Sequence, residues 1–430
     1  MKIPEERLRA LAAHTMDPPI TLAEGAAMAS ALLKRKSAKK SKGPDPAREL
    51  RAALEHVRAL DLPKYMPVMN YALVSGAILR ATDLYSELEI AIPDLGGSGL
   101  LPIVDVLMAL KGASGAVTWD GARQLTMGST SVQLLAPPLV EDYPAMSWGA
   151  AIEEPPPVAS PAPPWKARES HVHTVDAAEL FTKIAAVEHA SSADETRPHL
   201  NGLLIVFRSG DHVDCAATDG HRLAVTDMSS EQERERVTTL ILPRSTLALL
   251  SRFSRGSDRL HMRWAWFDRK HVGFGETLGR VEISGAGWRL RAKPVDGHFP
   301  PYEKVIPGPG TMRWDLPRGA ITAALEALSA APQGRCGGSR LEVSEDGSTL
   351  VMSLESPDSG TITHRVPVQP TGERFVIGVN AGYLLDATRS ITGDAVVIDV
   401  GYSKDKAIDP IRVWSPAAPL DMRVVMPCRM

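Results

Sequence analysis

Asp219 and His221 are the residues whose types come closest to part of a nucleophilic catalytic triad in this 430-residue chain. A hydrolase triad needs a serine or cysteine that the histidine activates, and a common form places the serine in a G-x-S-x-G turn. No such turn occurs, and the two residues lie only two positions apart in Thr218-Asp219-Gly220-His221-Arg222. A hydrolase would need a nucleophile that the sequence does not offer, so this segment favours a tight turn.

Two other patterns could suggest a metal or a cofactor. His171-Val172-His173 alternates as strand neighbours do, which can place two imidazoles on one face, but a third ligand at a suitable spacing is missing. Gly273-Phe274-Gly275 and Gly279 miss the dinucleotide-binding spacing, and no Walker sequence is present. We therefore expect no metal, no cofactor, no ATP hydrolysis and no enzyme activity.

Composition limits the class of protein. The length suits about three domains, and hydrophobic content of 44% is typical of globular proteins. No apolar run is long enough for a transmembrane helix, and the N-terminus lacks the apolar core of a signal peptide. The net charge of -3 gives no overall attraction to DNA, although local charge can still bind it. A cytoplasmic protein with reduced thiols is expected from its three scattered cysteines, Cys215, Cys336 and Cys428.

A long-period repeat organises most of the chain. Amphipathic helices are predicted over 45–60, 176–189 and 317–328, so that the unit recurs after 129 and 141 residues (positions 47, 176 and 317). Each unit carries a further helix, which follows Leu101-Pro102, Leu242-Pro243 or Val379-Asn380. Short alternating runs that suit antiparallel strands lie between the helices, such as 203–207, 281–283, 350–354 and 395–400. The pattern predicts an α+β protein of three repeated units, each with two helices packed on antiparallel sheets.

Two low-complexity stretches separate these units. The first is the basic run 34–44, and the second is the proline-rich stretch 153–164, which should form a stiff tether. The basic run could touch DNA as an arm or tail, or could be a solvated linker. The predicted division is an extension over 1–45, a first domain over 46–147, a linker over 148–168, a second domain over 169–307 and a third over 308–430.

Several segments together resemble the bacterial DNA sliding clamp family, the β subunit of DNA polymerase III. They are Arg197–Gly202, Thr218–Ala224, Phe299–Pro307, Asp142–Pro144 and the C-terminal Val424–Met430. Over 45–430 the order of elements is also similar. The resemblance implies a ring-shaped, head-to-tail homodimer in which six domains surround duplex DNA, with helices facing the hole and sheets facing outward.

The resemblance also implies a cleft that binds short peptide motifs of partner proteins. Apolar walls with a few polar groups suit such a cleft, and methionine at its rim suits several partners. The residues carried over are Leu200, Thr218, Gly220, His221, Arg222, Leu223, Pro300, Lys304, Val305, Val424, Met426, Pro427, Cys428, Arg429 and Met430. A plain tight turn for 218–223 and a frayed tail for 426–430 remain alternatives.

A clamp that slides needs phosphate attraction without base readout. The expected contacts are basic residues on the helices and on loops near which clamps touch DNA: Arg48, Arg51, Lys64, Lys111, Lys183, Arg197, Arg244, Arg252, Arg255, Arg318 and Arg389. Arg58 is a further candidate. Each could equally be a solvated surface charge.

The expected function is therefore that of a processivity factor without enzyme activity. Its expected partners are duplex DNA, a second copy, the catalytic subunit of DNA polymerase III, a clamp-loader ATPase and other proteins with clamp-binding motifs, but no membrane. The first unit departs most from the family pattern. A monomeric, clamp-derived interaction module or decoy, which keeps the cleft but does not close a ring, is therefore the alternative. Leu134 and Leu135, with Ala327 and Leu328, are candidates for the dimer contact or for the core.

Overall fold

The structure, a computed structural model, describes residues 45–58, 60, 62–63, 65–144, 167–208, 211–227, 238–253, 258–268, 277–330, 338–356, 360–401 and 409–428. Among these residues no helix is long and apolar enough to cross a membrane. The predicted basic run and proline-rich tether lie outside the described residues, as do Lys64, Arg255, Arg429 and Met430.

The six predicted helices are confirmed. They occur as one pair in each unit: α3 (Pro46–Val57) and α4 (Ile103–Ala109), α6 (Ala177–Val187) and α7 (Arg244–Phe253), and α8 (Arg318–Ala330) and α9 (Ala381–Ser390). Capping side chains explain where two of them begin, because Asp176 accepts a hydrogen bond from the amide of Glu179, and Asn380 accepts one from the amide of Tyr383.

Half-sheets of neighbouring units join into long antiparallel sheets. An eight-stranded sheet has the order β4-β1-β2-β3-β15-β14-β13-β8. Its first four strands come from the first unit and its last four from the second: β1 (Tyr71–Ser75), β2 (Ile78–Thr82), β3 (Ser86–Ala91), β4 (Gly99–Pro102), β8 (Ala167–Asp176), β13 (Arg259–Asp268), β14 (Thr277–Gly285) and β15 (Trp288–Ala292).

The second and third units are joined in the same way. A nine-stranded sheet has the order β12-β9-β10-β11-β24-β23-β22-β16-β20. Its strands are β9 (Gly202–Phe207), β10 (Val213–Thr218), β11 (Arg222–Val225), β12 (Thr238–Pro243), β16 (Met312–Pro317), β20 (Gln369–Thr371), β22 (Ala395–Val400), β23 (Ile411–Ser415) and β24 (Ala418–Val425).

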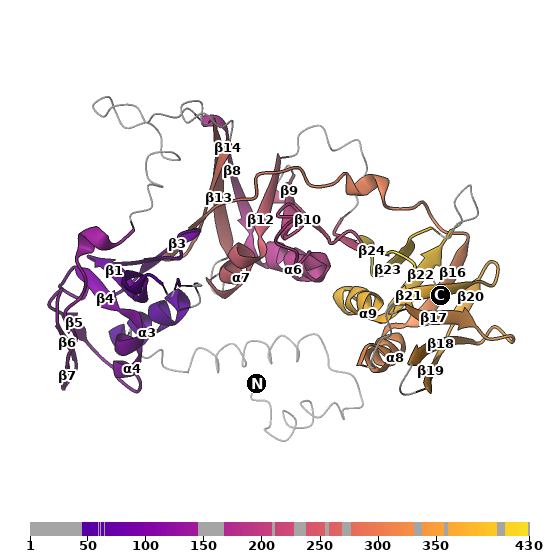
Figure 1. Ribbon diagram of the computed structural model, residues 1–430, viewed down its shortest axis with the longest axis horizontal. Helices are drawn as coiled ribbons and strands as arrows, with labels where there is room; N and C mark the ends of the chain where they lie inside the picture. The colour runs from indigo at the N-terminus through magenta and orange to yellow at the C-terminus, as the bar shows by residue number, and fades with distance from the viewer. Residues whose placement is uncertain are drawn as a thin grey trace, which may run out of the picture.

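Two smaller sheets lie at the two ends of the molecule (Figure 1). The first unit contributes β5-β6-β7 and the third contributes β19-β18-β17-β21. Their strands are β5 (Val117–Trp119), β6 (Gln124–Met127), β7 (Thr130–Gln133), β17 (Gly338–Val343), β18 (Thr349–Ser356), β19 (Gly360–Pro367) and β21 (Val376–Asn380). Each small sheet is thus a half-sheet without a partner unit among the described residues.

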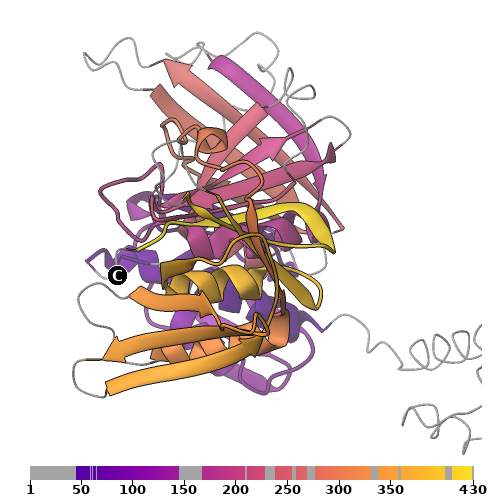
Figure 2. The same ribbon diagram turned by 90° about the vertical axis from the view of Figure 1, so that its right-hand side faces the viewer.

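The units form an arch with the helices along one side. In Figure 1, α4, α3, α7, α6, α9 and α8 follow the lower side of the arch, and the sheets lie above and outside them. The end-on view in Figure 2 places the orange and yellow elements of the third unit in front and the indigo elements of the first unit behind. The fold therefore presents one helical face along its whole length.

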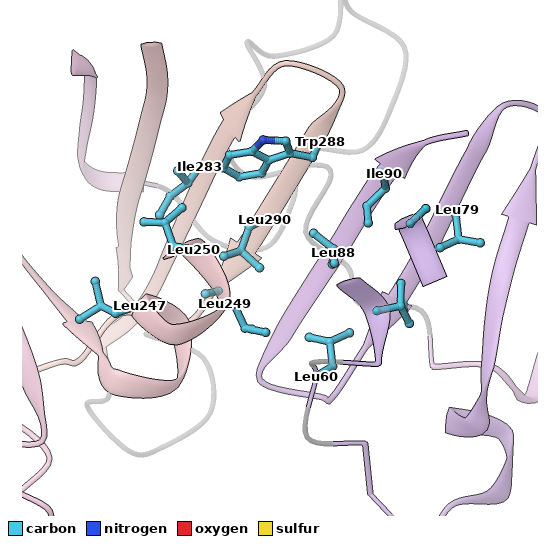
Figure 3. Close-up of a cluster of buried hydrophobic side chains, with 14 of the residues drawn as sticks. Leu60, Leu79, Leu88, Ile90, Leu247, Leu249, Leu250, Ile283, Trp288 and Leu290 are labelled. Carbon is cyan, nitrogen blue, oxygen red and sulfur yellow. The ribbon is translucent and has the colours of Figure 1, made fainter. Parts of the chain in front are cut away.

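The joint between the first two units has a continuous apolar core. Leu88 and Ile90 of β3 approach Trp288 and Leu290 of β15, with leucines of α7 beneath them (Figure 3). All four side chains are buried, and they belong to one cluster that includes residues of both units. Burial of a large side chain contributes about 1.5–3 kcal/mol, so these four side chains stabilise the joint between the two units.

Candidate functional site

The turn between β10 and β11 is built by its own side chains. The hydroxyl of Thr218 donates to the carbonyl of Arg222 over 2.7 Å and accepts from the amide of Gly220. One carboxylate oxygen of Asp219 accepts from the amides of His221 and Arg222. Gly220 has a φ of 91°, which a residue with a side chain rarely adopts. Asp219 is thus occupied in holding the turn, and His221 is exposed at its tip.

Arg222 connects this turn to the third unit. Its Nε donates to Asp219 and its Nη1 donates to Asp386 of α9 over 2.6 Å, while its guanidinium carbon lies 4.5 Å from the centre of the Tyr383 ring. The imidazole of His221 is also nearly parallel to that ring. Tyr383 and Asp386 therefore belong to the site, although the sequence pattern did not single them out. Asp386 is 164 positions from Arg222, so no local signal could have paired them.

The described part of the C-terminal tail runs beside β11 and the turn that precedes it. β24 pairs with β11 so that Leu223 faces Val424 and Arg222 faces Val425. The amide of Met426 then donates to the carbonyl of His221 over 2.9 Å, and the amide of Cys428 donates to the carbonyl of Gly378 over 2.8 Å. Met426 is 39% exposed. The tail is thus fixed to both units up to Cys428.

The connector after β15 covers the outer face of the nine-stranded sheet. Leu223 and Val424 belong to a buried apolar cluster on that face, against which Phe299 and Tyr302 of the connector pack. The helical turn η6 (Tyr302–Lys304) ends at Val305, which is 47% exposed. The connector therefore brings Pro300, Lys304 and Val305 to the sheet that carries the turn and the tail.

Leu200 approaches the turn from a third segment. It is buried, and its amide donates to the carbonyl of Arg197. An added Cβ on Gly220 would lie 3.8 Å from Nη1 of Arg197, so the two loops are neighbours. The predicted cleft residues thus come from the loop before β9, the turn, the connector and the tail. This geometry gives a buried apolar cluster at a joint between two units, with exposed Val305 on the connector and exposed Met426 on the tail.

A buried polar layer lies beneath the turn. Arg423 of β24 is 1% exposed, and its guanidinium donates to the carbonyls of Val225, Met422 and Ser390. Burial lowers the pKa of Arg423 to about 10. Its hydrogen bonds to Val225 in the second unit and Ser390 in the third connect the two units beneath the turn. Its charge lies at the C-terminal end of α9, where a cation is favoured.

His189 lies in the same layer. Burial, and then the positive charges of Arg423 and Arg222, lower the pKa of His189 to about 3. Its Nδ1 is buried and has no hydrogen-bond partner within the described part of the chain. His189 is therefore neutral at physiological pH.

The first joint repeats the turn but not its apolar surface. Thr82 and Asp83 bond the turn 82–86 in the same pattern as Thr218 and Asp219, and Leu84 takes the place of Gly220 at a φ of 75°. The cross-strand pair that corresponds to Leu223 and Val424 is Glu87 with Arg291, which are 2.9 Å apart. The same scaffold is thus apolar at one joint and ionic at the other.

This ionic pair is part of a larger network across β2, β3, β15 and β14. Arg291 also contacts Glu89 and Glu282. Arg80 and Arg289 each contact Glu89 as well. Burial raises the pKa of the Glu87 carboxyl, and the Arg291 hydrogen bond opposes that rise. The network fills the surface of the first joint with paired charges.

Of the ten described candidates for DNA contact, five form ion pairs within the chain and a sixth bonds a carbonyl. The pairs are Arg48 with Asp45, Arg51 with Glu55, Lys183 with Asp214, Arg197 with Asp194 and Arg389 with Glu326, while Arg318 donates to the carbonyl of Gly393. Lys111, Arg244, Arg252 and Arg58 are exposed, and no ion pair among the described residues involves them. These four are the cations that can reach a phosphate without first breaking a pair.

His171 and His173 have a packing role. Both imidazoles lie against the buried Trp264, with ring centroids 5.2 and 5.3 Å away, and His173 also contacts Phe207. Among the described residues no group of three or more His, Cys, Asp or Glu side chains could hold a metal ion.

Comparison with known proteins points to one family. Residues 174–301 match the family described as DNA polymerase III beta subunit, central domain. The beta sliding clamp of Escherichia coli (strain K12) is 24% identical over 378 residues, which are 85% of this chain and 93% of that protein. Both matches are to the bacterial sliding clamp family, which this chain resembles. Its α+β fold of antiparallel sheets is the clamp fold.

Two further comparisons describe how far the likeness extends. The beta sliding clamp of Caulobacter vibrioides (strain NA1000 / CB15N) is 29% identical over 259 residues, 60% of this chain, and the alignment spans 65% of that relative's length. The crystal structure of the DNA polymerase III subunit beta from Pseudomonas aeruginosa has a TM-score of 0.71 at 22% identity, covering 90% of this chain and 99% of that one. Sequence identity is modest, whereas the clamp fold extends over nearly the whole chain.

The residues suggested for the dimer contact divide into two kinds. Leu134 and Leu328 are buried in the two main cores. Leu135 is 81% exposed, and Ala327 is also exposed. Leu135 and Ala327 stay available for a contact between copies.

Proposed function

We propose that this chain is a homodimeric DNA sliding clamp that encircles duplex DNA and tethers the replicative polymerase. The observation that carries the proposal is the repeated joint. Each unit has two half-sheets. At the first joint, β3 of the first unit pairs with β15, the last strand of the second unit. At the second joint, β11 of the second unit pairs with β24, the last strand of the third unit.

Strand pairing of the same kind would form the contact between two copies. β19 corresponds to β3 and β11, and β7 corresponds to β15 and β24. Both are outer strands of their sheets among the described residues, so each presents backbone groups that a further strand can pair. Pairing β19 of one copy with β7 of another, twice, closes two arches head to tail into a ring.

The helical face is the side on which DNA would lie. On the concave side of the arch (Figure 1), α7 carries Arg244 and Arg252 at exposed positions, and Lys111 is exposed in the turn after α4. Phosphate contacts of this kind hold DNA without reading its sequence, so the ring remains free to slide. Encirclement would replace tight binding as the source of retention.

The surface at the second joint suits the tethering of partners. Met426 on the tail and Val305 on the connector are exposed apolar side chains beside the buried cluster of Leu223 and Val424, and a flexible partner with a short apolar motif would fit there. A polymerase that holds such a motif stays near the primer end because its effective concentration rises. A clamp loader and other factors would use the same surface.

A monomeric, clamp-derived hub is the second candidate. It is favoured by the pairing of Arg48, Arg51, Lys183 and Arg389 with carboxylates of the same chain, because paired cations attract phosphates weakly. Such a protein would keep the apolar surface at the second joint and would compete for clamp partners.

Oligomeric state and retention on DNA separate the two functions. Sedimentation at micromolar concentration, followed by loading onto nicked circular and linear DNA, measures both. The ring predicts a dimer that stays on circles and runs off linear ends. A monomer that is retained on neither template would refute the ring and support the hub.

A further inference from the structure

A hollow of about 620 Å³ lies on the other side of the connector from the turn and tail. Its lining includes Leu204 of β9, Thr239 and Ile241 of β12, and Pro300 and Tyr302 of the connector. Pro300 is also one of the residues predicted for the peptide cleft. The hollow and the cleft are therefore neighbours along one sheet, with the connector between them.

One wall of the hollow is an open strand edge. β12 is an outer strand of its sheet in the part of the chain that the structure describes. The carbonyl of Ile241 accepts from the amide of Val295 in the connector, so the backbone groups of Ile241 point away from β9. Alternate residues of a strand point their backbone groups to the same side, so those of Thr239 point toward the hollow. An extended peptide could continue the sheet there.

The rim of the hollow is acidic. Asp296 and Glu303 are exposed and line it together with His171 and His298, and none of its described lining residues is a lysine or an arginine. A ligand with positive charge is therefore favoured over a neutral or acidic one. The polar rim differs from the apolar cluster of Leu223 and Val424, which the connector covers.

We propose that the hollow binds a basic extension of the same partner peptide whose apolar motif occupies the cleft. This rests on the proposed tethering function and adds a second contact to it. β11 and β12 are separated by β9 and β10, and strands lie about 4.8 Å apart, so the two contacts are about 14 Å apart. An extended chain spans about 3.3 Å per residue, which places the lysines or arginines about four to six residues from the apolar anchor.

The extension crosses the connector at Pro300 and Pro301, because this segment lies between the two contacts. It then pairs with Thr239 along β12 and places its basic side chains near Asp296 and Glu303. Partners with both parts would bind more tightly than partners with the apolar motif alone, so the hollow would rank partners that compete for one clamp.

Synthetic peptides test the proposal on the full chain. The probes are a six-residue peptide with leucine and phenylalanine anchors, and the same peptide extended at either end by Gly-Ser-Gly-Ser-Lys-Arg-Lys or by Gly-Ser-Gly-Ser-Glu-Ser-Glu. At low salt we expect one basic extension to tighten binding about tenfold, and the acidic extension to give no gain. Asp296→Lys with Glu303→Lys should reverse this preference and leave the short peptide unchanged.

A second variant tests the strand edge. Thr239→Pro removes an amide that points away from β9, which an outer strand tolerates, and it should abolish the gain from the basic extension without weakening the short peptide. A basic extension that gives no gain, or an equal gain in the charge-reversed variant, would overturn the proposal while the cleft stands. Failure of the short peptide itself would refute the tethering function together with this proposal.

A competing occupant is this chain's own proline-rich stretch, which ends close before His171 in the lining of the hollow. Replacement of 149–164 by a Gly-Ser linker distinguishes it. If the basic extension gains affinity only in that variant, the hollow belongs to the chain's own segment and the proposal is wrong. An equal gain with and without the replacement supports it.

Discussion

The guanidinium of Arg222 in β11 donates to the carboxylate of Asp386 in α9 over 2.6 Å, and this contact joins the second unit to the third. The same guanidinium is held by Asp219 and lies over the Tyr383 ring. Arg222 therefore sets the position of the turn relative to α9. Because the proposed cleft takes residues from both units, we expect loss of this contact to change its shape.

Asp386→Asn should weaken peptide binding while leaving the fold intact. The variant keeps the shape of the side chain but removes the charge that orients Arg222, and a charge-assisted hydrogen bond contributes about 1–2 kcal/mol. We expect affinity for an apolar peptide to fall about 5- to 30-fold in fluorescence anisotropy. Glu342→Gln, which removes a carboxylate paired with Arg340 elsewhere in the third unit, is the matched control. Equal effects of both variants would contradict a specific role for Asp386.

Glycine should have opposite effects on stability when it is removed from the turn at Gly220 and when it is introduced into the equivalent turn at Leu84. Gly220→Ala forces a side chain to a φ of 91° and should destabilise the protein by about 1–2 kcal/mol. Leu84→Gly relieves a φ of 75° in the matching turn and should stabilise it by about 1 kcal/mol. Urea unfolding measures both changes. A loss of stability in Leu84→Gly would mean that packing of the leucine outweighs its backbone strain.

Local patterns were enough to predict the helices and the main turn. Apolar residues at helical spacing and a cap such as Asn380 predicted each helix, because these signals act within a few residues. The Thr-Asp pair at 218–219 also recurs at 82–83, so the second turn could have been found as part of the repeat. Each helix and turn signal lies within a short segment, and comparison of such segments along one sequence is enough to find the repeat.

Charge pairing could not be predicted in the same way. Lys183 looked like a DNA contact on an exposed helix face, but it bonds Asp214 of β10, which is 31 positions away. The Glu87–Arg291 pair joins residues 204 positions apart, and nothing near either residue indicates the other. Whether a basic residue is available to DNA depends on such long-range partners, so the predicted DNA set and the predicted cleft remain predictions at the level of single residues.

Acid should loosen the second joint through His189. Its pKa is about 3 in the folded protein and near 6.5 in the unfolded chain, so the unfolded state takes up the proton first. The stability that neutral His189 provides is complete above pH 6.5 and is lost as pH falls toward 3, by up to about 1.4 kcal/mol per pH unit. The melting temperatures of wild type and His189→Gln, measured from pH 7.5 to 4, should therefore approach each other as pH falls. His298→Gln, at an exposed position of the connector, serves as the control. A constant difference in melting temperature between wild type and His189→Gln across this pH range would contradict the assignment.

The tail should be needed for peptide binding but not for the dimer. Truncation after Val425 keeps the whole of β24 and removes the segment that bonds His221 and Gly378. We expect the apolar peptide to lose binding by at least tenfold, because the exposed Met426 is removed, while sedimentation is unchanged. Unchanged peptide affinity would show that the tail is not part of the cleft.

DNA binding should depend on unpaired cations more than on paired ones. Arg244 and Arg252 lie on α7 and have no ion pair among the described residues, whereas Arg48 and Arg51 of α3 are paired with Asp45 and Glu55. Arg244→Gln with Arg252→Gln should weaken binding to duplex DNA and reduce the slope of log K against log salt by about one for each phosphate that the variant no longer neutralises. Arg48→Gln with Arg51→Gln removes the same charge but should change the slope less, because those cations are already neutralised in the fold. Filter binding between 50 and 200 mM salt compares the two doubles, and equal slopes would mean that ion pairs on α3 open freely when DNA arrives.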